Sequence, residues 1–481
     1  MANLDCFFSP KSIAVVGASN NPRKPGCIIV GNLLQKGFPG EIYPVNPKEA
    51  AVLGKAAFPT LSEIPGEVEL VVLITPAAMI YGVMADLALR MERRGDIKAL
   101  VCAAADYGET KTAEGVRRQS CLLETASKFG IRVLGPNCIG VIDNRTRVDT
   151  TFVDAGIPAD AYNTQSGISV ISQSGSVATS IIMMGAARPE PVQFNKFASL
   201  GNMTDVDFID LLEHYEQDKT TSVIGVYMEG YPDGRRLIET MGRIARKKPI
   251  VVLKVGRGQK GAKAASSHTG SLAGSDATYD AAFRQYGVIR TDTFGELIDT
   301  MISLDRLALP RGGNLYILSQ AGGFGIYCAD NVEKYPFIRM PGLAQATADT
   351  LAGLLPPMAV VDEPEGYADI TASASEEQHA QSLAAILRDD GVDCVILITI
   401  TPSFISQKKL GESLRDAYLA LPEEYRKPVY FCIMAGEYVR ESRRILEQAG
   451  LCTYDTPLEA VRSARDMMRY AGYLAAKEES L

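Results

Sequence analysis

The fold of this chain is decided by residues 13–37, IAVVGASNNPRKPGCIIVGNLLQKG. A short apolar run ends at Gly17, a polar loop follows, and the segment closes with apolar residues at helical spacing. This order of strand, glycine turn and helix is typical of the first unit of a nucleotide-binding α/β fold. The loop lacks the G-x-G-x-x-G spacing, so the sequence carries no dinucleotide fingerprint here.

Four more short apolar runs follow, and each ends in a turn or a small residue: EIYPVNP at 41–47, ELVVLITPA at 69–77, IKALVCAAA at 97–105 and IRVLGPN at 131–137. Parallel strands have this pattern when their carboxyl ends line a ligand crevice. The sequence therefore predicts an N-terminal Rossmann domain over residues 1–145.

A second α/β unit opens at residues 168–185, ISVISQSGSVATSIIMMG, after a polar segment at 143–167 that predicts a connection between domains. Serine hydroxyls and backbone N–H groups at a helix N-terminus form an anion cradle, although a plain serine N-cap has the same sequence. A later strand, TSVIGVYMEG at 221–230, presents Glu229 at its end. The cradle residues are Ser172, Ser174, Gly175 and Ser176.

A third unit begins at residues 314–330, NLYILSQAGGFGIYCAD, and repeats the scheme of strand, glycine-rich loop and helix. We expect two flavodoxin-like domains with parallel sheets, over residues 146–305 and 306–481. Thr456-Pro457-Leu458-Glu459 predicts the start of the last helix, because it combines a capping box with proline at the first helical position.

Composition limits the function classes. The 481 residues carry a formal net charge of −8 without a run of lysine or arginine, which argues against a nucleic-acid partner. Nine scattered cysteines without a CxxC pair indicate reduced thiols in a cytoplasmic protein, and no metal site. No apolar run reaches the roughly 20 residues that span a membrane, so we expect no membrane partner.

His268 is one of three histidines and lies in residues 256–275, GRGQKGAKAASSHTGSLAGS. Leu272 is the one large apolar side chain of this stretch, which cannot bury enough surface to fix itself. We therefore expect a mobile loop on which the histidine is either incidental or chemically active. His214 and His379 lie in helical patterns and are expected to be structural.

Together these motifs resemble the ADP-forming acyl-CoA synthetases of the acetate–CoA ligase type, which are relatives of succinyl-CoA synthetase. The resemblance covers essentially the whole chain. VVGASNNPRKPG, IYPVNPK, ITPA and LGPNCIG are similar to the family's CoA-binding domain, whereas SQSGSVA, YMEG and KVGRGQKGAKAASSHTGSLAG are similar to its phosphohistidine domain. The last two motifs are the most specific.

The resemblance implies a relay. Acyl-CoA and phosphate exchange to give an acyl phosphate, a histidine takes the phosphoryl group, and its loop swings to a distant site and phosphorylates ADP. The carrier implied here is His268, with Glu229 as its orienting partner and Gly270 joining the serine cradle around the phosphate. A neutral imidazole is in any case a good nucleophile near pH 7 and needs such a partner to hold its tautomer.

For CoA the resemblance implies a path along the strand ends of the first domain. The phosphates are expected near Gly17, the adenosine toward Asn46, and the pantetheine past Thr75 toward Asn137. The full set of expected CoA residues is Gly17, Ala18, Ser19, Lys24, Asn46, Pro47, Lys48, Thr75, Pro76 and Asn137.

No ATP-grasp unit is visible, so the resemblance implies an α subunit whose ATP or ADP and Mg²⁺ lie on an ATP-grasp β subunit, in an α2β2 heterotetramer. Two stretches depart from the family: GYAD at 366–369, where many members have Asn-Pro-Val-Asp, and AAADYGE at 103–109, where many have Ser-Gly-Phe before Glu. The acid therefore stays open between acetate-like, branched and aryl acids. The alternative function is a CoA-sensing or acyl-transfer regulatory module without ligase activity.

Overall fold

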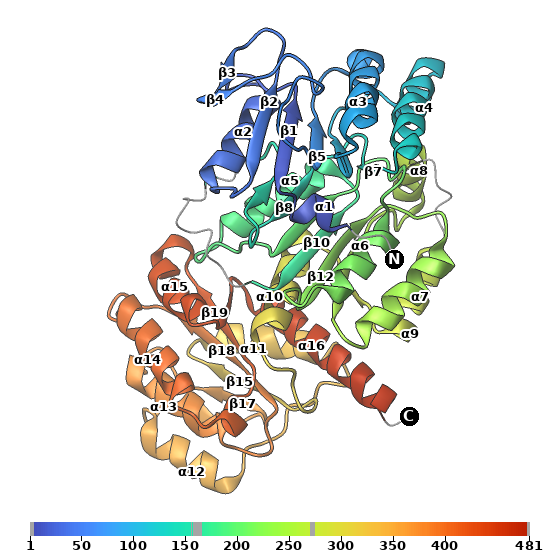
Figure 1. Ribbon diagram of the computed structural model, residues 1–481. Coiled ribbons are helices and arrows are strands. Elements are labelled where there is room, and N and C mark those ends of the chain that lie inside the picture. The colour runs from blue at the N-terminus through green and yellow to red at the C-terminus, as the bar shows by residue number, and fades with distance from the viewer. Residues whose placement is uncertain (1–3, 155, 157–165, 270–274, 479–481) are drawn as a thin grey trace. The chain divides into compact units, whose positions relative to one another are not determined.

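A computed structural model describes residues 4–154, 156, 166–269 and 275–478, with the side chains of residues 266–269 excepted. Its contacts divide the chain into two compact units, residues 1–186 with 191–292, and residues 187–190 with 293–481. The first unit holds two large sheets and the second unit holds one (Figure 1). None of the helices within the described ranges is long and apolar enough to cross a membrane.

The first sheet is parallel, with the order β2-β1-β5-β6-β7. Its inner strand β1 is buried along its whole length because SIAVV packs between the apolar clusters on the two faces. The elements are α1 (Asp5–Phe8), β1 (Ser12–Val16), α2 (Pro25–Gln35), β2 (Glu41–Val45), β3 (Ala51–Val52), β4 (Lys55–Ala56), β5 (Leu70–Leu73), η1 (Ala77–Met79), α3 (Ile80–Arg94), β6 (Ala99–Cys102), η2 (Gly108–Thr110), α4 (Ala113–Lys128) and β7 (Arg132–Leu134).

The second sheet has the order β14-β13-β12-β10-β11-β8-β9 and shares one continuous apolar cluster with the first sheet. Strand β8 pairs antiparallel with β11, whereas β10 to β14 are parallel. The elements are β8 (Val141–Asp143), β9 (Val148–Asp149), β10 (Ile168–Ser172), α5 (Gly175–Ala186), β11 (Lys196–Ser199), α6 (Phe208–Gln217), β12 (Val223–Met228), α7 (Gly234–Ala245), β13 (Ile250–Lys254), α8 (Gln259–Thr269), α9 (Asp276–Tyr286) and β14 (Ile289–Arg290).

The third sheet has the order β16-β17-β15-β18-β19-β20, and its own apolar cluster lies within the second unit. The predicted capping box opens α16, because the Glu459 N–H donates to Oγ1 of Thr456 at 3.4 Å and the Thr456 N–H donates to Oε2 of Glu459 at 3.0 Å. The elements are α10 (Phe294–Arg306), β15 (Leu315–Ser319), α11 (Gly322–Val332), α12 (Gln345–Leu354), β16 (Val360–Val361), β17 (Tyr367–Asp369), α13 (Glu376–Leu387), β18 (Cys394–Ile400), α14 (Gln407–Leu419), η4 (Glu423–Tyr425), β19 (Val429–Met434), η5 (Gly436–Val439), α15 (Arg440–Gln448), β20 (Cys452–Tyr454) and α16 (Pro457–Glu478).

All three sheets arrange their parallel strands in the same order, 2-1-3-4-5 when the strands are numbered along the chain within each sheet. In such a sheet the ligand crevice opens at the carboxyl ends of strands 1 and 3, where the strand order reverses. The expected fold class is confirmed. The crevices lie at β1 and β5 in the first sheet and at β10 and β12 in the second.

Two expectations about local structure were wrong. The start of the segment read as a polar connection belongs to the β8–β9 hairpin, because Val148 within it and Val141 and Ile142 just before it are buried in the second sheet. The stretch expected to be a loop around His268 is instead helical from Gln259 to Thr269. Alanine, lysine and glutamine are strong helix formers, and their propensity prevails over that of the glycines in this stretch.

Candidate functional site

The crevice of the second sheet brings the loop after β10 beside the end of β12. The Ser172 hydroxyl donates to the Ser174 carbonyl at 2.8 Å, and the hydroxyls of Ser174 and Ser176 lie 3.2 Å apart. Helix α5 begins at Gly175, so serine hydroxyls lie beside its first-turn N–H groups, an arrangement suited to an anion. Ser172 is fully buried and shapes the loop without facing solvent.

Glu229 follows the last residue of β12 and is buried, with an exposed fraction of 8%. Oε1 of Gln173 accepts from the backbone N–H of Glu229 at 2.7 Å and from that of Gly230 at 3.2 Å. Burial raises the pKa of Tyr227 to about 12, and the charge and hydrogen bond of the Glu229 carboxylate add to this rise. The structure therefore places a buried carboxylate next to the serine cradle.

A cavity of about 900 Å³ is lined by residues from both sheets of the first unit. Five of the expected residues line it, namely Asn137, Ser174, Gly175, Ser176 and Glu229. The cavity is also lined by residues outside the expected site set, among them Ala103, Ala105 and Glu109 of the stretch noted for acid specificity, and Lys111, Phe152, Gln173, Gly201, Asn202, Met203 and Thr204. Many of them follow strands β6 and β11, which only the sheet order brings to this cavity.

Glu109 joins two walls of this cavity. Its Oε2 accepts from Nδ2 of Asn202 at 2.6 Å, and its Oε1 accepts from the Asp106 N–H at 2.6 Å. Asp106 has a φ of 80°, and Met203, which follows Asn202, has a φ of 52°. Residues other than glycine rarely adopt positive φ, and such backbone gathers at functional sites.

The carboxyl edge of the first sheet gathers the expected CoA residues in strand order. Asn46, Gly17 and Thr75 follow the adjacent strands β2, β1 and β5, and Asn137 follows β7 at the far end of the same edge. The Gly17 N–H donates to the Val45 carbonyl at 3.0 Å, and Nδ2 of Asn46 donates to the Ala18 carbonyl at 2.7 Å. The loops after β1 and β2 are therefore joined directly.

The loop after β1 is held tightly. Gly17 has a φ of +98°, and a Cβ added at Gly26 would lie 2.2 Å from the Gly17 carbonyl oxygen, so α2 begins directly against the turn. Glu49, which sequence reasoning missed, accepts from the Ser19 hydroxyl at 3.2 Å. Of the expected residues Lys24, Pro47, Lys48 and Pro76 are exposed, Gly17, Asn46, Thr75 and Asn137 are half-buried, and Ala18 and Ser19 are buried.

His268 belongs by its backbone to the last turn of α8, and its side chain lies outside the described part of the structure. Gly270 lies outside the described residues altogether. Helix α8 is connected to β13 through Gly256, which has a φ of +77°. Among the α8 side chains that the structure describes, residues 259–265, Ala265 alone is buried.

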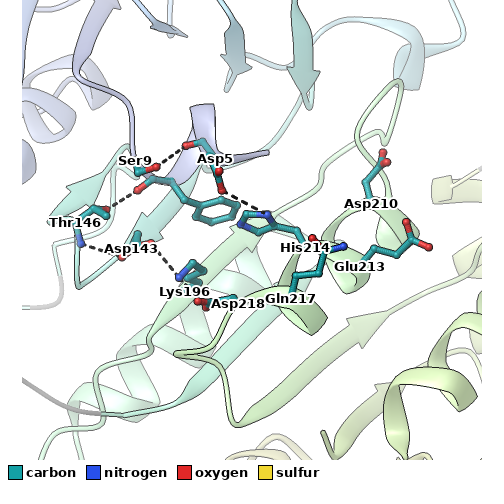
Figure 2. A pocket seen from close by; sticks show the side chains of 11 residues that line it. Asp5, Ser9, Asp143, Thr146, Lys196, Asp210, Glu213, His214, Gln217 and Asp218 are labelled. Atoms are coloured by element: carbon teal, nitrogen blue, oxygen red, sulfur yellow. Dashed lines mark hydrogen bonds and ion pairs between the residues drawn. The ribbon is translucent and has the colours of Figure 1, made fainter. Parts of the chain in front are cut away.

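His214 lies on α6 and lines a different pocket (Figure 2). Its ring stacks on Phe8 with 5.0 Å between ring centroids, and its Nδ1 lies 4.0 Å from a carboxylate oxygen of Asp5. Burial lowers the pKa of His214, although the Asp5 carboxylate opposes this effect. His214 thus packs against the N-terminal segment, as expected of a structural histidine.

His379 lies on α13 and is fully buried, with its Nδ1 2.7 Å from the Ser375 carbonyl oxygen. All nine cysteines are free thiols and seven of them are buried. Within the described ranges no group of three or more histidine, cysteine, aspartate or glutamate side chains is arranged to hold a metal ion.

Comparison with known proteins identifies both domains of the first unit. A model of the CoA binding domain matches residues 11–144, and a model of the succinyl-CoA ligase like flavodoxin domain matches residues 165–304. These are the segments that supply the first sheet and most of the second.

Full-length relatives extend this match. The chain is 36% identical to the α subunit of acetate–CoA ligase [ADP-forming] II of Pyrococcus furiosus, over 97% of this chain and 98% of that one. It is 34% identical to acetate–CoA ligase [ADP-forming] I of Archaeoglobus fulgidus, over 99% of this chain and 64% of the relative.

A solved structure, the dinucleotide-forming acetyl-coenzyme A synthetase 1 of Ca. Korarchaeum cryptofilum with phosphate and ADP, matches with a TM-score of 0.87. It is 30% identical, over 100% of this chain and 99% of that chain. The chain belongs to the family of ADP-forming acyl-CoA ligases, with the α subunits of acetate–CoA ligase among its full-length relatives.

Proposed function

We propose that this chain is the CoA-binding and phosphoryl-carrying subunit of an ADP-forming acyl-CoA ligase, and that acyl transfer and phosphorylation occur in the 900 Å³ cavity. One observation carries this proposal. The wall supplied by the CoA-binding domain, with Glu109 and Asn137, encloses the same cavity as the serine cradle and Glu229 of the ligase domain. A thioester and an anion held by these two walls meet in one space.

The chemistry has two steps before the nucleotide takes part. An oxygen of phosphate attacks the thioester carbonyl, the C–S bond breaks, and CoA leaves as a thiolate that takes up a proton. An imidazole nitrogen of His268 then attacks the phosphorus of the acyl phosphate, the P–O bond to the acyl oxygen breaks, and the carboxylate leaves. Transfer of the phosphoryl group from the histidine to ADP gives ATP.

The side chains in the cavity suit these steps. The N-terminus of α5 and the hydroxyls of Ser174 and Ser176 offer hydrogen-bond donors and a positive helix end to the phosphoryl oxygens. The Glu229 carboxylate is buried beside them and is the orienting partner that an imidazole nucleophile requires. We include Ser172 as support for the loop and Gly270 as part of the phosphate set.

We assign CoA to the carboxyl edge of the first sheet. The adenosine end lies by Asn46, Pro47 and Lys48, and the phosphates lie by Gly17 to Ser19 with Lys24 nearby. The pantetheine then passes Thr75 and Pro76 toward Asn137 at the cavity. The strand order supports this path, because β2, β1, β5, β6 and β7 follow one another along the edge. Lys24 and Lys48 are exposed and free to meet phosphate as point charges.

We further propose that the nucleotide site, with Mg²⁺, lies on an ATP-grasp β subunit in an α2β2 assembly. The Pyrococcus furiosus relatives are named as α subunits and match this chain over nearly their whole length. The Archaeoglobus fulgidus ligase is matched over 64% of its length, which leaves about a third of that protein without a counterpart in this chain. The regulatory alternative is not favoured, because the relatives named above are ligases and synthetases.

The full chain tests this proposal without a partner. It is incubated with [32P]phosphate in three parallel reactions, which contain acetyl-CoA, isobutyryl-CoA or phenylacetyl-CoA. We expect at least one of them to release free thiol and to leave up to one phosphoryl group per chain, while acid, ATP and CoA give no acyl-CoA. Absence of thiol release and label with all three acyl-CoA compounds would contradict the proposal, and ATP-dependent ligase activity of the chain alone would contradict the assignment of the nucleotide site.

A further inference from the structure

We propose that Gln173 is a positioning residue that fixes Glu229 relative to the serine cradle, an inference that rests on the function proposed above. Gln173 lies between Ser172 and Ser174 in the cradle loop, and the residue is 5% exposed. Its Oε1 accepts from the N–H groups of Glu229 and Gly230, at 2.7 and 3.2 Å. One amide thus joins the loop that holds the anion to the strand end that presents the carboxylate.

The backbone contacts show why this side chain is needed. The register between β10 and β12 ends with the pair Ser172 and Tyr227, and the Gln173 N–H donates to the Tyr227 carbonyl at 3.1 Å. Glu229 lies two residues further along the chain, after β12 has ended. Oε1 of Gln173 extends the pairing past the end of the strand, because its two lone pairs accept from two consecutive N–H groups.

The backbone pairing of β12 with β13, on its other side, also ends before Glu229. Met228 is paired with Lys254 of β13, and the Val255 N–H donates to the Met228 carbonyl at 3.1 Å. Loss of the Gln173 acceptor would therefore remove two hydrogen bonds to consecutive N–H groups at the buried strand end, which is costly, so the segment would rearrange. The carboxylate would move relative to the cradle, whereas the cradle N–H groups of α5 would stay in place.

A Gln173→Met variant tests this in the full chain, because methionine has nearly the same volume and no amide acceptor. Using the acyl-CoA that labels the wild type fastest, we expect the labelling rate at saturating phosphate to fall about 10- to 100-fold, since displacement of a reacting group by about 1 Å costs on the order of 100-fold. The phosphate concentration for half-maximal rate should stay within about 3-fold of the wild-type value, because the helix N-terminus that binds phosphate is retained.

A double-mutant cycle separates positioning from a general structural role. If Gln173 acts through Glu229, then adding Gln173→Met to Glu229→Gln should slow labelling no further than Glu229→Gln alone. If the double variant slows labelling by the product of the two single-variant factors, the inference is overturned. If Gln173→Met does not fold, Gln173→Asn serves in its place, because its shorter side chain cannot reach the strand end and the expected result is the same.

Asn195 supplies a matched control. It is a buried amide of the same sheet, 2% exposed, and its Nδ2 donates to Thr220 Oγ1 at 2.9 Å. It precedes β11, at the amino edge of the sheet and so away from the cradle. Asn195→Leu should lower the melting temperature and leave the labelling rate unchanged. If the wild type takes up no label, the proposed function is rejected. If the wild type is labelled and Gln173→Met is labelled at the same rate, only this inference is rejected.

Discussion

Helix α13 carries His379 and helix α8 carries His268, and the two helices are held by the fold in different ways. Helix α13 opens with a capping box, in which the Ser375 hydroxyl accepts from the Gln378 N–H at 3.2 Å and Oε1 of Gln378 accepts from the Ser375 N–H at 2.9 Å. Seven of its residues are buried, including His379 itself. Helix α8 follows the glycine turn at Gly256 and buries Ala265 alone among its described side chains.

Under the proposed function, this difference distinguishes a structural histidine from one that has to move. Burying one methyl group contributes about 1 kcal/mol, whereas each large apolar side chain contributes about 1.5–3 kcal/mol. The described side chains of α8 therefore stabilise it weakly, and segments with little buried surface open locally at low cost. A phosphoryl carrier needs such a segment, and His379 on its packed helix could not serve.

The largest effect is expected from the histidines themselves. His268→Ala should abolish the phosphoryl label and leave CoA affinity unchanged, because the residues proposed to bind CoA lie at the edge of the first sheet. His379→Gln should keep the label and lower the free energy of unfolding, since His379 is fully buried. Labelling with [32P]phosphate and calorimetric titration with CoA measure both variants. A full phosphoryl label on His268→Ala would contradict the assignment of the carrier to α8.

The next largest effect is expected at Glu229. Glu229→Gln removes the charge that we propose orients and stabilises the imidazole, so the labelling rate should fall about 100-fold or more. Glu376 on α13 is the control, because it is equally buried at 8% and accepts from the Ser406 N–H at 2.8 Å. Glu376→Gln should leave the rate unchanged. Similar slowing by both variants would mean that any buried carboxylate matters, and would contradict the role given to Glu229.

Acid should destabilise the fold partly through His379. Burial lowers the pKa of His379, so the unfolded chain takes up a proton first as the pH falls below about 6.5. The free energy of unfolding then falls, by at most about 1.4 kcal/mol per pH unit for this group, until the folded-state pKa is reached. Urea unfolding followed by circular dichroism at pH 7.5 and 5.5 should show a smaller loss for His379→Gln than for the wild type. An equal loss would contradict the prediction.

The smallest effect concerns the stability of α8. Gly261 lies inside this helix, and an added Cβ would meet its nearest atom at 3.4 Å, which is ordinary contact. Gly261→Ala should stabilise the helix by about 0.5–1 kcal/mol, and so slow amide hydrogen exchange of residues 259–269 about 2- to 5-fold. The control is Gly353→Ala on α12, where an added Cβ meets nothing within 4 Å, and this variant should leave exchange in α8 unchanged. Unaltered exchange in Gly261→Ala would show that α8 does not open as a helix.

Much of the fold follows from the sequence because glycine-ended apolar runs recur. Such runs at 13–18, 168–175 and 314–322 predicted the first of the parallel strands in each of the three sheets. The β8–β9 hairpin was missed, because its strands are two or three residues long and the second of them lies in a polar segment. Helix α8 was missed because glycine and serine were weighted above the helix-forming alanines and lysines.

The candidate site was predictable only where its residues share a local motif. The serine cradle and Glu229 each lie at a strand end that the sequence marks. Glu109, Gln173 and Asn202 act through contacts across 56 or more residues, and nothing in the local sequence indicates those partners. Such contacts depend on which strands neighbour each other, which a single sequence does not specify.

The most direct test of the account is the position of the label. Wild-type chain carrying [32P]phosphate from the acyl-CoA reaction is digested with trypsin, which should release residues 264–284 as one peptide with His268 as its single histidine. We predict a label that is stable in alkali, lost in acid and confined to this peptide, at His268. An alkali-labile label on the peptide containing Glu229, or a label on the peptides containing His214 or His379, would contradict the claim that α8 carries the phosphoryl group.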